Sequence, residues 1–275
     1  MLYKGTPGMT VTELDKTALD KTATEDYAAE EARLRRELAA VYRLVAHFKM
    51  TDLIFNHISV RLPGPGHRFL INPFGLLYEE VTASNLVTVG LDGQLTTDGP
   101  WTVNAAGFVI HSAIHSARED ALCVLHTHAK ASCAVAAQAG GLLPLNQMSL
   151  QFYNRVAYHD YEGIALSNAE KKRLVADLGD KPVMLLRNHG LLTVGRDPGQ
   201  AFLRMFYLER ACEIQVDALS GGTAIVTPPD EVCEHTARQF EGDHSADDYT
   251  TGENPNLAWD AMLRLVERLY PDYKD

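Results

Sequence analysis

Two histidines at the end of a short apolar run constrain this chain more than any other feature. Residues 121–125 are mostly apolar, as in a buried strand, and His126 and His128 lie at the far end of that run. Because side chains on a strand alternate between its faces, both imidazoles project from the same side. A stretch of small residues, typical of a helix, follows and ends at Gly140. The pair therefore lies at a strand-to-helix junction, where α/β sheets usually carry their sites.

A third histidine lies about sixty residues later, in a turn between two apolar segments. His189 is followed by Gly190, and the pattern predicts two strands joined by a tight turn. His189 is thus held at a strand end, as His126 and His128 are. We therefore expect these three side chains to bind one divalent metal. The alternative is two unrelated clusters of histidines with structural partners.

Several longer segments resemble the class II aldolase/adducin family over residues 35–220, with the adducin head domain the most similar. The likeness is carried by residues 74–84, 104–108, 156–164, 186–190 and 211–216. The resemblance implies an α/β fold, a three-layer α/β/α domain with a central mixed, largely antiparallel sheet, often in a homotetramer. It also implies a divalent metal on the histidines that match His126, His128 and His189. That metal would be zinc, or Fe(II) if the protein is an oxygenase.

The resemblance breaks where the aldolases of the family carry Ser-Ser-Glu. The matching positions here are Ala105, Ala106 and Gly107, so the acid/base glutamate is replaced by glycine. The family's first-loop Gly-Asn corresponds to Asn56-His57, and its second-loop Thr-Gly corresponds to Phe74-Gly75. Because hydroxyl groups that would cradle a phosphate are missing at three places, we expect an unphosphorylated substrate.

Other polar residues are candidates for the remaining roles. Glu162 and Tyr158 are the candidates for the missing base, although a polar loop with satisfied side chains is the alternative. The predicted substrate-binding residues are His57, Asn72, Gly75, Asn104, His111, Lys130 and Arg187, the last two being available for a carboxylate. His111 and His115 are four residues apart on one predicted helix and are a second candidate metal pair. Because no glutamate lies between them, we prefer a role for that pair in packing or in support of the site.

Charge and cysteine content exclude several classes of protein. The net charge of −11 and pI near 5.4 argue against nucleic acid or an anionic membrane as partner. No run of eighteen apolar residues exists, and the N-terminus lacks the apolar core of a signal peptide. The four cysteines show no C-x-x-C spacing and are expected to be free thiols in a reducing cytoplasm.

The order of apolar and polar segments predicts three regions. Residues 1–25 are expected to be a flexible arm, followed by a helix over 26–49. The resemblance implies that residues 26–222 form a class II aldolase/adducin domain. Residues 223–275 form a C-terminal extension, in which a long polar surface segment precedes an amphipathic helix over 257–270. The apolar stripe of that helix is expected to pack across a subunit boundary, which predicts a homo-oligomer of four chains with sites near the interfaces.

Three functions are compatible with these features. The first is a lyase that uses the metal as a Lewis acid on a carbonyl group. The second is a non-haem Fe(II) oxygenase, an oxidative decarboxylase with open metal positions for substrate and O₂. The third is a non-catalytic, adducin-like binding module, against which the acidic C-terminus counts. We expect metal-dependent C–C bond cleavage of a small, non-phosphorylated carbonyl or keto acid, with oxidative decarboxylation as the alternative.

Overall fold

The computed structural model describes residues 11–64, 66–97, 99–163, 168–242 and 257–275. The strands are β1 (His57–Arg61), β2 (Arg68–Ile71), β3 (Val87–Gly90), β4 (Cys123–Thr127), β5 (Val156–His159), β6 (Val183–Leu186) and β7 (Gly190–Gly195). The helices are α1 (Val11–His47), α2 (Ala105–Ala117), α3 (Lys130–Ala136), α4 (Gln147–Leu150), α5 (Asn168–Leu178), α6 (Pro198–Ser220), α7 (Asp230–Phe240) and α8 (Leu257–Leu269). Two short 3-10 turns cover Tyr78–Glu80 and Pro271–Lys274. None of the described helices is long and apolar enough to cross a bilayer.

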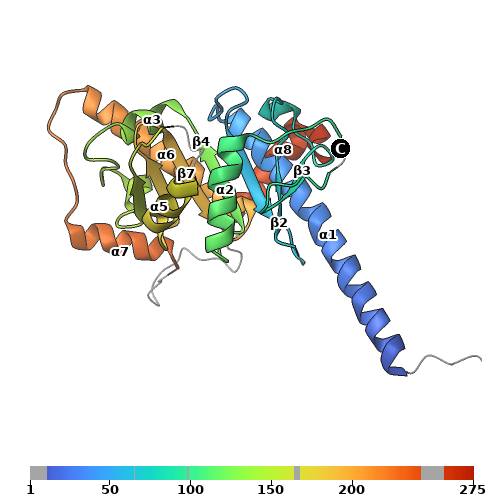
Figure 1. Ribbon diagram of the computed structural model, residues 1–275. Coiled ribbons are helices and arrows are strands. Elements are labelled where there is room, and N and C mark those ends of the chain that lie inside the picture. Colours follow the sequence, from blue (N-terminus) through green and yellow to red (C-terminus); the bar gives the residue numbers. More distant parts are fainter. Residues whose placement is uncertain (1–10, 65, 98, 164–167, 243–256) are drawn as a thin grey trace, which may run out of the picture.

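The strands form one mixed sheet in the order β3-β2-β1-β4-β7-β6-β5. Only β5 and β6 pair in parallel, and every other neighbouring pair is antiparallel. Helices α1, α3, α6 and α8 cover one face of the sheet, while α2 and α5 cover the other (Figure 1). The predicted three-layer α/β fold with a largely antiparallel sheet is therefore confirmed.

The alternation of side chains along β4 shows how the central strand fills both layers. Leu125 is fully buried in the large core beneath α1 and α6, whereas Val124 is buried in the smaller core with Ile114 of α2 and Leu174 of α5. By the same alternation, His126 faces the α2 side of the sheet. The sheet thereby determines on which face the histidine site is built.

Strand pairing brings the two histidine segments together. Strands β4 and β7 are antiparallel neighbours with Thr127 paired to Leu191, so the end of β4 lies beside the start of β7. The turn between β6 and β7 therefore projects next to the residues that follow β4. Gly190 is required there, because a Cβ atom on it would collide with the backbone oxygen of Thr127. The close approach of these two backbones positions the turn that carries His189.

Both ends of the chain differ from the sequence prediction. Helix α1 begins at Val11 rather than near residue 26, so residues 11–25 are helical, and the flexibility expected for them stays a prediction. Residues 1–10 lie outside the described residues. The polar segment after residue 222 contains helix α7, which is tied to the body where Arg155 pairs with Glu234 and Glu241. The division into three regions otherwise stays a prediction.

The final helix packs against its own chain. Trp259 of α8 is 8% exposed, with its ring 6.2 Å from that of Phe202 on α6, and Val266 is fully buried. Gly199 leaves the space for that indole, because a Cβ atom on it would lie 2.6 Å from the ring. The face of α8 that carries Trp259 and Val266 is therefore covered within the chain, whereas Leu257 and Leu269 of the predicted stripe are exposed.

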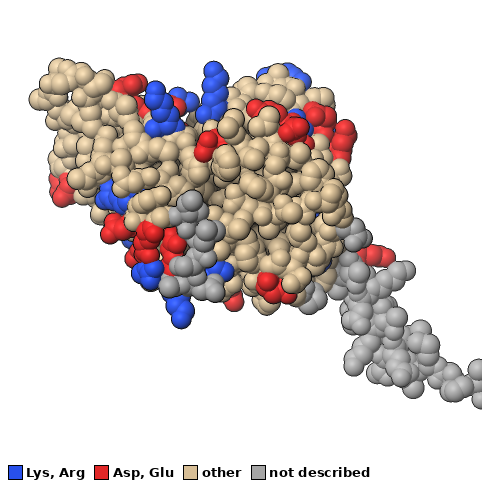
Figure 2. All heavy atoms as spheres, turned by 45° about the horizontal axis from the view of Figure 1, so that its top comes forward, with Lys and Arg blue, Asp and Glu red and all other residues tan. Residues whose placement is uncertain are grey.

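Charged side chains do not gather into a basic patch on the face shown in Figure 2. Lysines and arginines lie there among aspartates and glutamates, and broad areas between them are uncharged. This face therefore offers no concentrated positive charge to a polyanion.

Candidate metal centre

Three imidazoles converge at one end of the sheet. The Nε2 atom of His128 lies 2.8 Å from the Nε2 atoms of both His126 and His189. A ligand atom from each of the three lies within 4.8 Å of the others. His126 is buried, while His128 and His189 are partly exposed. The structure therefore brings together the three residues that were predicted to bind one metal.

The outer nitrogens of two of these rings fix where the lone pairs point. The Nδ1 atom of His126 lies 2.7 Å from the backbone oxygen of Leu191, and that of His128 lies 2.9 Å from the Asp52 carboxylate. Both oxygens only accept hydrogen bonds, so each Nδ1 atom donates. In the neutral rings, the two Nε2 atoms then carry lone pairs directed at each other. Such a contact is repulsive unless a cation lies between the nitrogens.

Burial disfavours protonation of two of the three ligands, His126 and His189. It lowers the pKa of His126 well below its usual range, and the neighbouring His189 ring adds to this effect. Burial, with a smaller contribution from His128, lowers the pKa of His189 to about 4. A proton on His126 or His189 is therefore a poor candidate for such a cation at neutral pH. Neutral imidazoles whose second nitrogen is hydrogen-bonded are the usual zinc ligands, so the residues present fit a divalent metal.

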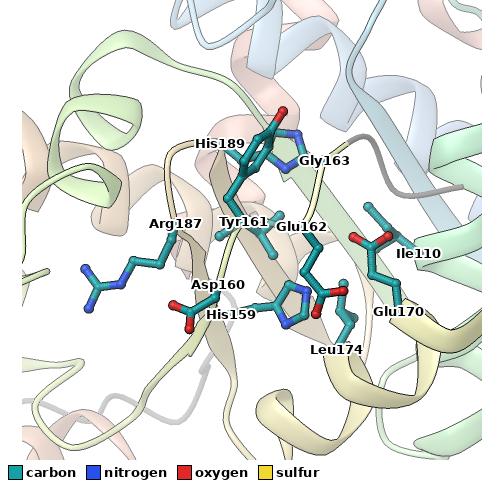
Figure 3. Close-up of a pocket in the computed structure, with 11 residues that line it drawn as sticks. Ile110, His159, Asp160, Tyr161, Glu162, Gly163, Glu170, Leu174, Arg187 and His189 are labelled. Atoms are coloured by element: carbon teal, nitrogen blue, oxygen red, sulfur yellow. The ribbon is translucent and has the colours of Figure 1, made fainter. Parts of the chain in front are cut away.

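A cavity of about 300 Å³ opens beside the three histidines. It is lined by Asp52, Phe55, His57, Asn104, Ala106, Ile110, His126, His128, Tyr161, Gly163 and His189. Among the described residues, no lysine or arginine lines it. A second hollow, of about 10 Å³, lies on the other side of His189, and Figure 3 shows Tyr161 next to that imidazole. The larger cavity is therefore the space available to a substrate.

Tyr158, Arg187 and Lys130 do not line this cavity. The Tyr158 hydroxyl accepts a hydrogen bond from the Leu142 amide, and its ring packs under the Arg187 guanidinium, 4.4 Å from the ring centre. Arg187 donates to the Gln138 oxygen and points away from His189 in Figure 3. Lys130 is exposed and lines neither hollow. The geometry therefore does not support a base role for Tyr158 or a carboxylate-binding role for Arg187 or Lys130.

Glu162 lies at the edge of the smaller hollow, where it pairs with Arg173. The Nε atom of Arg173 is 2.6 Å from its carboxylate, and this contact holds the pKa of Glu162 below its ordinary value. A carboxylate that is exposed and already paired is a weak proton acceptor. Its placement gives no support to the predicted base role.

Two of the remaining predicted residues have structural roles. The Asn72 side chain is buried and accepts from the Tyr42 hydroxyl at 2.9 Å. Gly75 has a φ of +106° in an exposed loop and lines neither hollow.

Asn104 lines the cavity, and its side chain caps α2 by accepting from the Gly107 amide at 3.1 Å. His57 lines the cavity as well, while His111 lies behind it.

Sequence reasoning missed Asp52 and Tyr161. Asp52 is 76 residues from His128 in sequence, so no local spacing indicated their contact. Tyr161 is 55% exposed, and its ring centre lies 6.4 Å from that of His189. It belongs to the polar segment already singled out. Side chains on a strand alternate between its two faces. To decide whether Tyr158 or Tyr161 faces the metal centre, one must know where β5 ends, and the sequence did not show this.

Comparison with known proteins identifies one family. The family model described as "Class II Aldolase and Adducin N-terminal domain" matches residues 36–216. A relative from Caulobacter vibrioides, whose name assigns it provisionally to the class 2 aldolases, is 49% identical, with 89% of this chain and 93% of that protein covered.

Solved structures agree with this assignment. The crystal structure of an aldolase II superfamily protein from Pseudomonas syringae is 51% identical, with a TM-score of 0.81, covering 89% of this chain and 96% of that one. The L-fuculose 1-phosphate aldolase from Glaciozyma antarctica is 29% identical, with a TM-score of 0.77, covering 90% and 94% of the two chains. The likeness therefore extends over about nine tenths of this chain.

Proposed function

The chain belongs to the class II aldolase and adducin N-terminal domain family, and on that premise we propose that it is a metal-dependent lyase. Its proposed reaction is C–C bond cleavage in a small, non-phosphorylated carbonyl acid, such as a hydroxy keto acid. The proposed metal ligands are His126, His128 and His189, and zinc is the proposed metal.

The observation that carries this proposal is the convergence of three Nε2 atoms at the edge of a cavity. Two of the three rings are held from behind by an acceptor on Nδ1, which leaves the inner nitrogens as ligands. When bound, the metal supplies a Lewis acid that polarises a carbonyl group. The chain contributes the orientation of the ligands and a cavity wide enough for a small acid.

The lining of the cavity supports a substrate without phosphate. A phosphate group is usually held by arginine, lysine or several free backbone amides. The described lining contains no cationic side chain, and Ala106 presents only a methyl group. The Gly107 amide at the start of α2 already donates to Asn104. The carboxylate of a keto acid needs fewer hydrogen-bond donors than a phosphate group does. Neither Lys130 nor Arg187 lines the cavity, so neither would bind that carboxylate.

We also propose a homotetramer with sites near the subunit interfaces. Large apolar side chains are exposed in the loops around the cavity, with Leu53, Phe55 and Leu77 being 67%, 47% and 41% exposed. Phe55 also lines the cavity itself. Contact with a second chain would cover these side chains and narrow the entrance.

The test incubates zinc-loaded and Fe(II)-loaded protein with a panel of hydroxy keto acids while products and O₂ are followed. We expect products with zinc and no O₂ uptake. O₂ uptake that depends on iron would replace the lyase with the oxygenase, which the relatives described above do not support. If neither form turns over any acid while His126→Ala leaves a partner-binding activity intact, the binding module takes its place.

A further inference from the structure

A row of four buried side chains lies behind the cavity on the α2 side of the sheet. The Nδ1 atom of His57 is 2.8 Å from Nε2 of His111, whose Nδ1 atom is 2.5 Å from Oγ of Ser59. The same Oγ atom is 2.7 Å from Nε2 of His115, whose Nδ1 atom is 3.0 Å from the backbone oxygen of Ala121. Each of these four side chains is at most 3% exposed. The row is therefore sealed from bulk water except where His57 meets the cavity.

The backbone oxygen at the inner end sets the direction of every hydrogen bond in the row. A carbonyl oxygen only accepts, so Nδ1 of His115 carries a proton and its Nε2 atom accepts from the Ser59 hydroxyl. With its proton used, the Ser59 oxygen accepts from Nδ1 of His111. Nε2 of His111 then accepts from Nδ1 of His57. At the outer end, Nε2 of His57 is left with a lone pair.

This direction holds as long as the three rings are neutral, and burial keeps them so. Burial lowers the pKa of His115 to about 3, with a smaller contribution from the charge of Arg61. Burial likewise lowers the pKa values of His57 and His111 well below the usual range. No carboxylate is hydrogen-bonded to any of the three rings among the described residues, so nothing compensates for the cost of charging them.

The outer end of the row faces the candidate metal centre. His57 and His126 are paired across β1 and β4, their ring centres are 5.0 Å apart, and both line the cavity. No described residue is hydrogen-bonded to Nε2 of His57. That nitrogen is therefore the one basic atom of the row within reach of a substrate.

Gly107 of α2 leaves space for the His57 imidazole. A Cβ atom on Gly107 would lie 2.5 Å from Cδ2 and 2.9 Å from Nε2 of His57. Any other residue at position 107 would therefore displace the ring. The glycine at position 107 and the histidine at position 57 form one arrangement, in which the imidazole occupies the space beside α2.

We propose that His57 is the catalytic residue that accepts and returns the proton during cleavage, and that His111, Ser59 and His115 are positioning residues that keep Nε2 of His57 free. This inference rests on the lyase proposed above. In a hydroxy keto acid, Nε2 takes the proton of the hydroxyl group, and the O–H electron pair becomes the second bond of a new carbonyl. The C–C bond breaks, and its electron pair forms an enolate. The enolate carbon then takes a proton from Nε2, so none is gained or lost overall, and a proton held on Nε2 can exchange with water in the cavity.

The inner end of the row explains why the proton returns to the substrate. The Ala121 oxygen is a backbone carbonyl and does not take up a proton at neutral pH, so the row does not conduct protons away from the cavity. It orients the His57 ring, because Nδ1 of His57 donates to Nε2 of His111. The row therefore acts by holding His57 in one tautomer.

The first test measures proton transfer by itself. Zinc-loaded protein is incubated with pyruvate in D₂O, and the exchange of methyl protons is followed by NMR. We expect His57→Gln to slow this exchange at least about 100-fold, in the range for loss of a general base, while zinc content and pyruvate affinity stay within about 3-fold. His235→Gln, a matched change at an exposed site on α7, should exchange like the wild type. Wild-type exchange in His57→Gln would overturn the role of His57.

The second test has a readout that does not depend on activity. In metal-free protein labelled with ¹⁵N-histidine, we expect His57, His111 and His115 to be protonated at Nδ1 and bare at Nε2. Ser59→Ala should remove this signature from His111 and lower kcat with little change in KM. A proton found on Nε2 of His57 in the wild type would contradict the direction of the row.

Steric coupling gives a third readout that does not depend on Ser59→Ala folding. Gly107→Ala should slow exchange in the wild type by displacing the His57 ring, and it should have no further effect in the His57→Gln background. Additive effects of the two changes would contradict the arrangement.

If the zinc-loaded wild type neither exchanges pyruvate nor cleaves any acid, the lyase proposal fails and the proton-transfer role fails with it. If the wild type is active and His57→Gln is equally active, only the role of His57 fails.

Discussion

Removal of the Asp52 carboxylate should weaken zinc binding without removing a ligand. Asp52 lies 2.9 Å from Nδ1 of His128, and its backbone amide donates to the Asn56 side chain at 2.6 Å, which fixes the loop. Loss of a carboxylate behind a metal-bound imidazole typically costs about 10- to 100-fold in metal affinity. Because the Asp52 side chain is 43% exposed, water replaces part of its effect. We therefore expect Asp52→Ala to weaken zinc binding about 10-fold, or about 1.4 kcal/mol.

The assay is a competition titration against a chromogenic zinc chelator at neutral pH. Asp52→Asn keeps an acceptor oxygen but loses the charge, so its effect should be smaller than that of Asp52→Ala. Asp180→Asn is the control, because Asp180 is exposed just before β6, whose far end leads to the site. An Asp52→Ala protein that binds zinc as tightly as the wild type would refute the reasoning. So would one that binds as weakly as His128→Ala.

Three further predictions concern the rest of the chain. Leu125→Ala on β4 should lower the free energy of unfolding by about 3 kcal/mol, because the side chain is fully buried. Urea denaturation measures this change, and a loss below about 1 kcal/mol would contradict the packing described. Arg155 holds the pKa values of Glu234 and Glu241 below the ordinary 4.5, so these contacts stabilise the docking of α7 above that pH and are lost as the pH falls through the lowered values. The protection factors of the α7 amides, which correct for the slower intrinsic exchange at acidic pH, should therefore fall at acidic pH in the wild type, and Arg155→Gln should show the lower protection already at pH 7. Light scattering at micromolar concentration should find four chains per particle, and a monomer would exclude the proposed assembly.

The three histidines were predictable because each lies at the end of an apolar strand. The i, i+2 spacing of His126 and His128 brings two imidazoles together once the strand is identified, and the turn at Gly190 holds His189 at the next strand end. Their convergence depends on β4 and β7 being neighbours, which the sequence patterns did not predict; the family resemblance supplied only the expectation of a shared metal. Asp52 was not predictable, because its contact with His128 joins segments that only the fold brings together.

The choice between neighbouring polar residues could not be made from the sequence, because it depends on which face of the strand each side chain occupies. Tyr158 and His159 are adjacent on β5, and alternation places them on opposite faces of the sheet. Tyr158 packs towards the core beneath α6, so its hydroxyl does not reach the cavity. The polar segment predicted a functional cluster but not which of its residues faces the metal centre.

Helix α7 was missed because its apolar face is narrow. Only Cys233 and Ala237 are buried, one turn apart, and the rest of the helix is polar or exposed. Two small residues give too weak a periodicity against the proline- and aspartate-rich sequence around them. Its position is set by the ion pairs of Arg155, a long-range contact that no local pattern encodes.

X-ray absorption of zinc-reconstituted protein tests the central claim most directly. The account predicts one zinc ion per chain, with three imidazole nitrogens at about 2.0–2.1 Å and the rest of the shell filled by light atoms from solvent. His126→Ala should lose both the stoichiometry and the imidazole scattering, whereas His235→Gln should keep both. Failure to retain zinc at one ion per chain would contradict the account, as would a shell dominated by sulfur at about 2.3 Å.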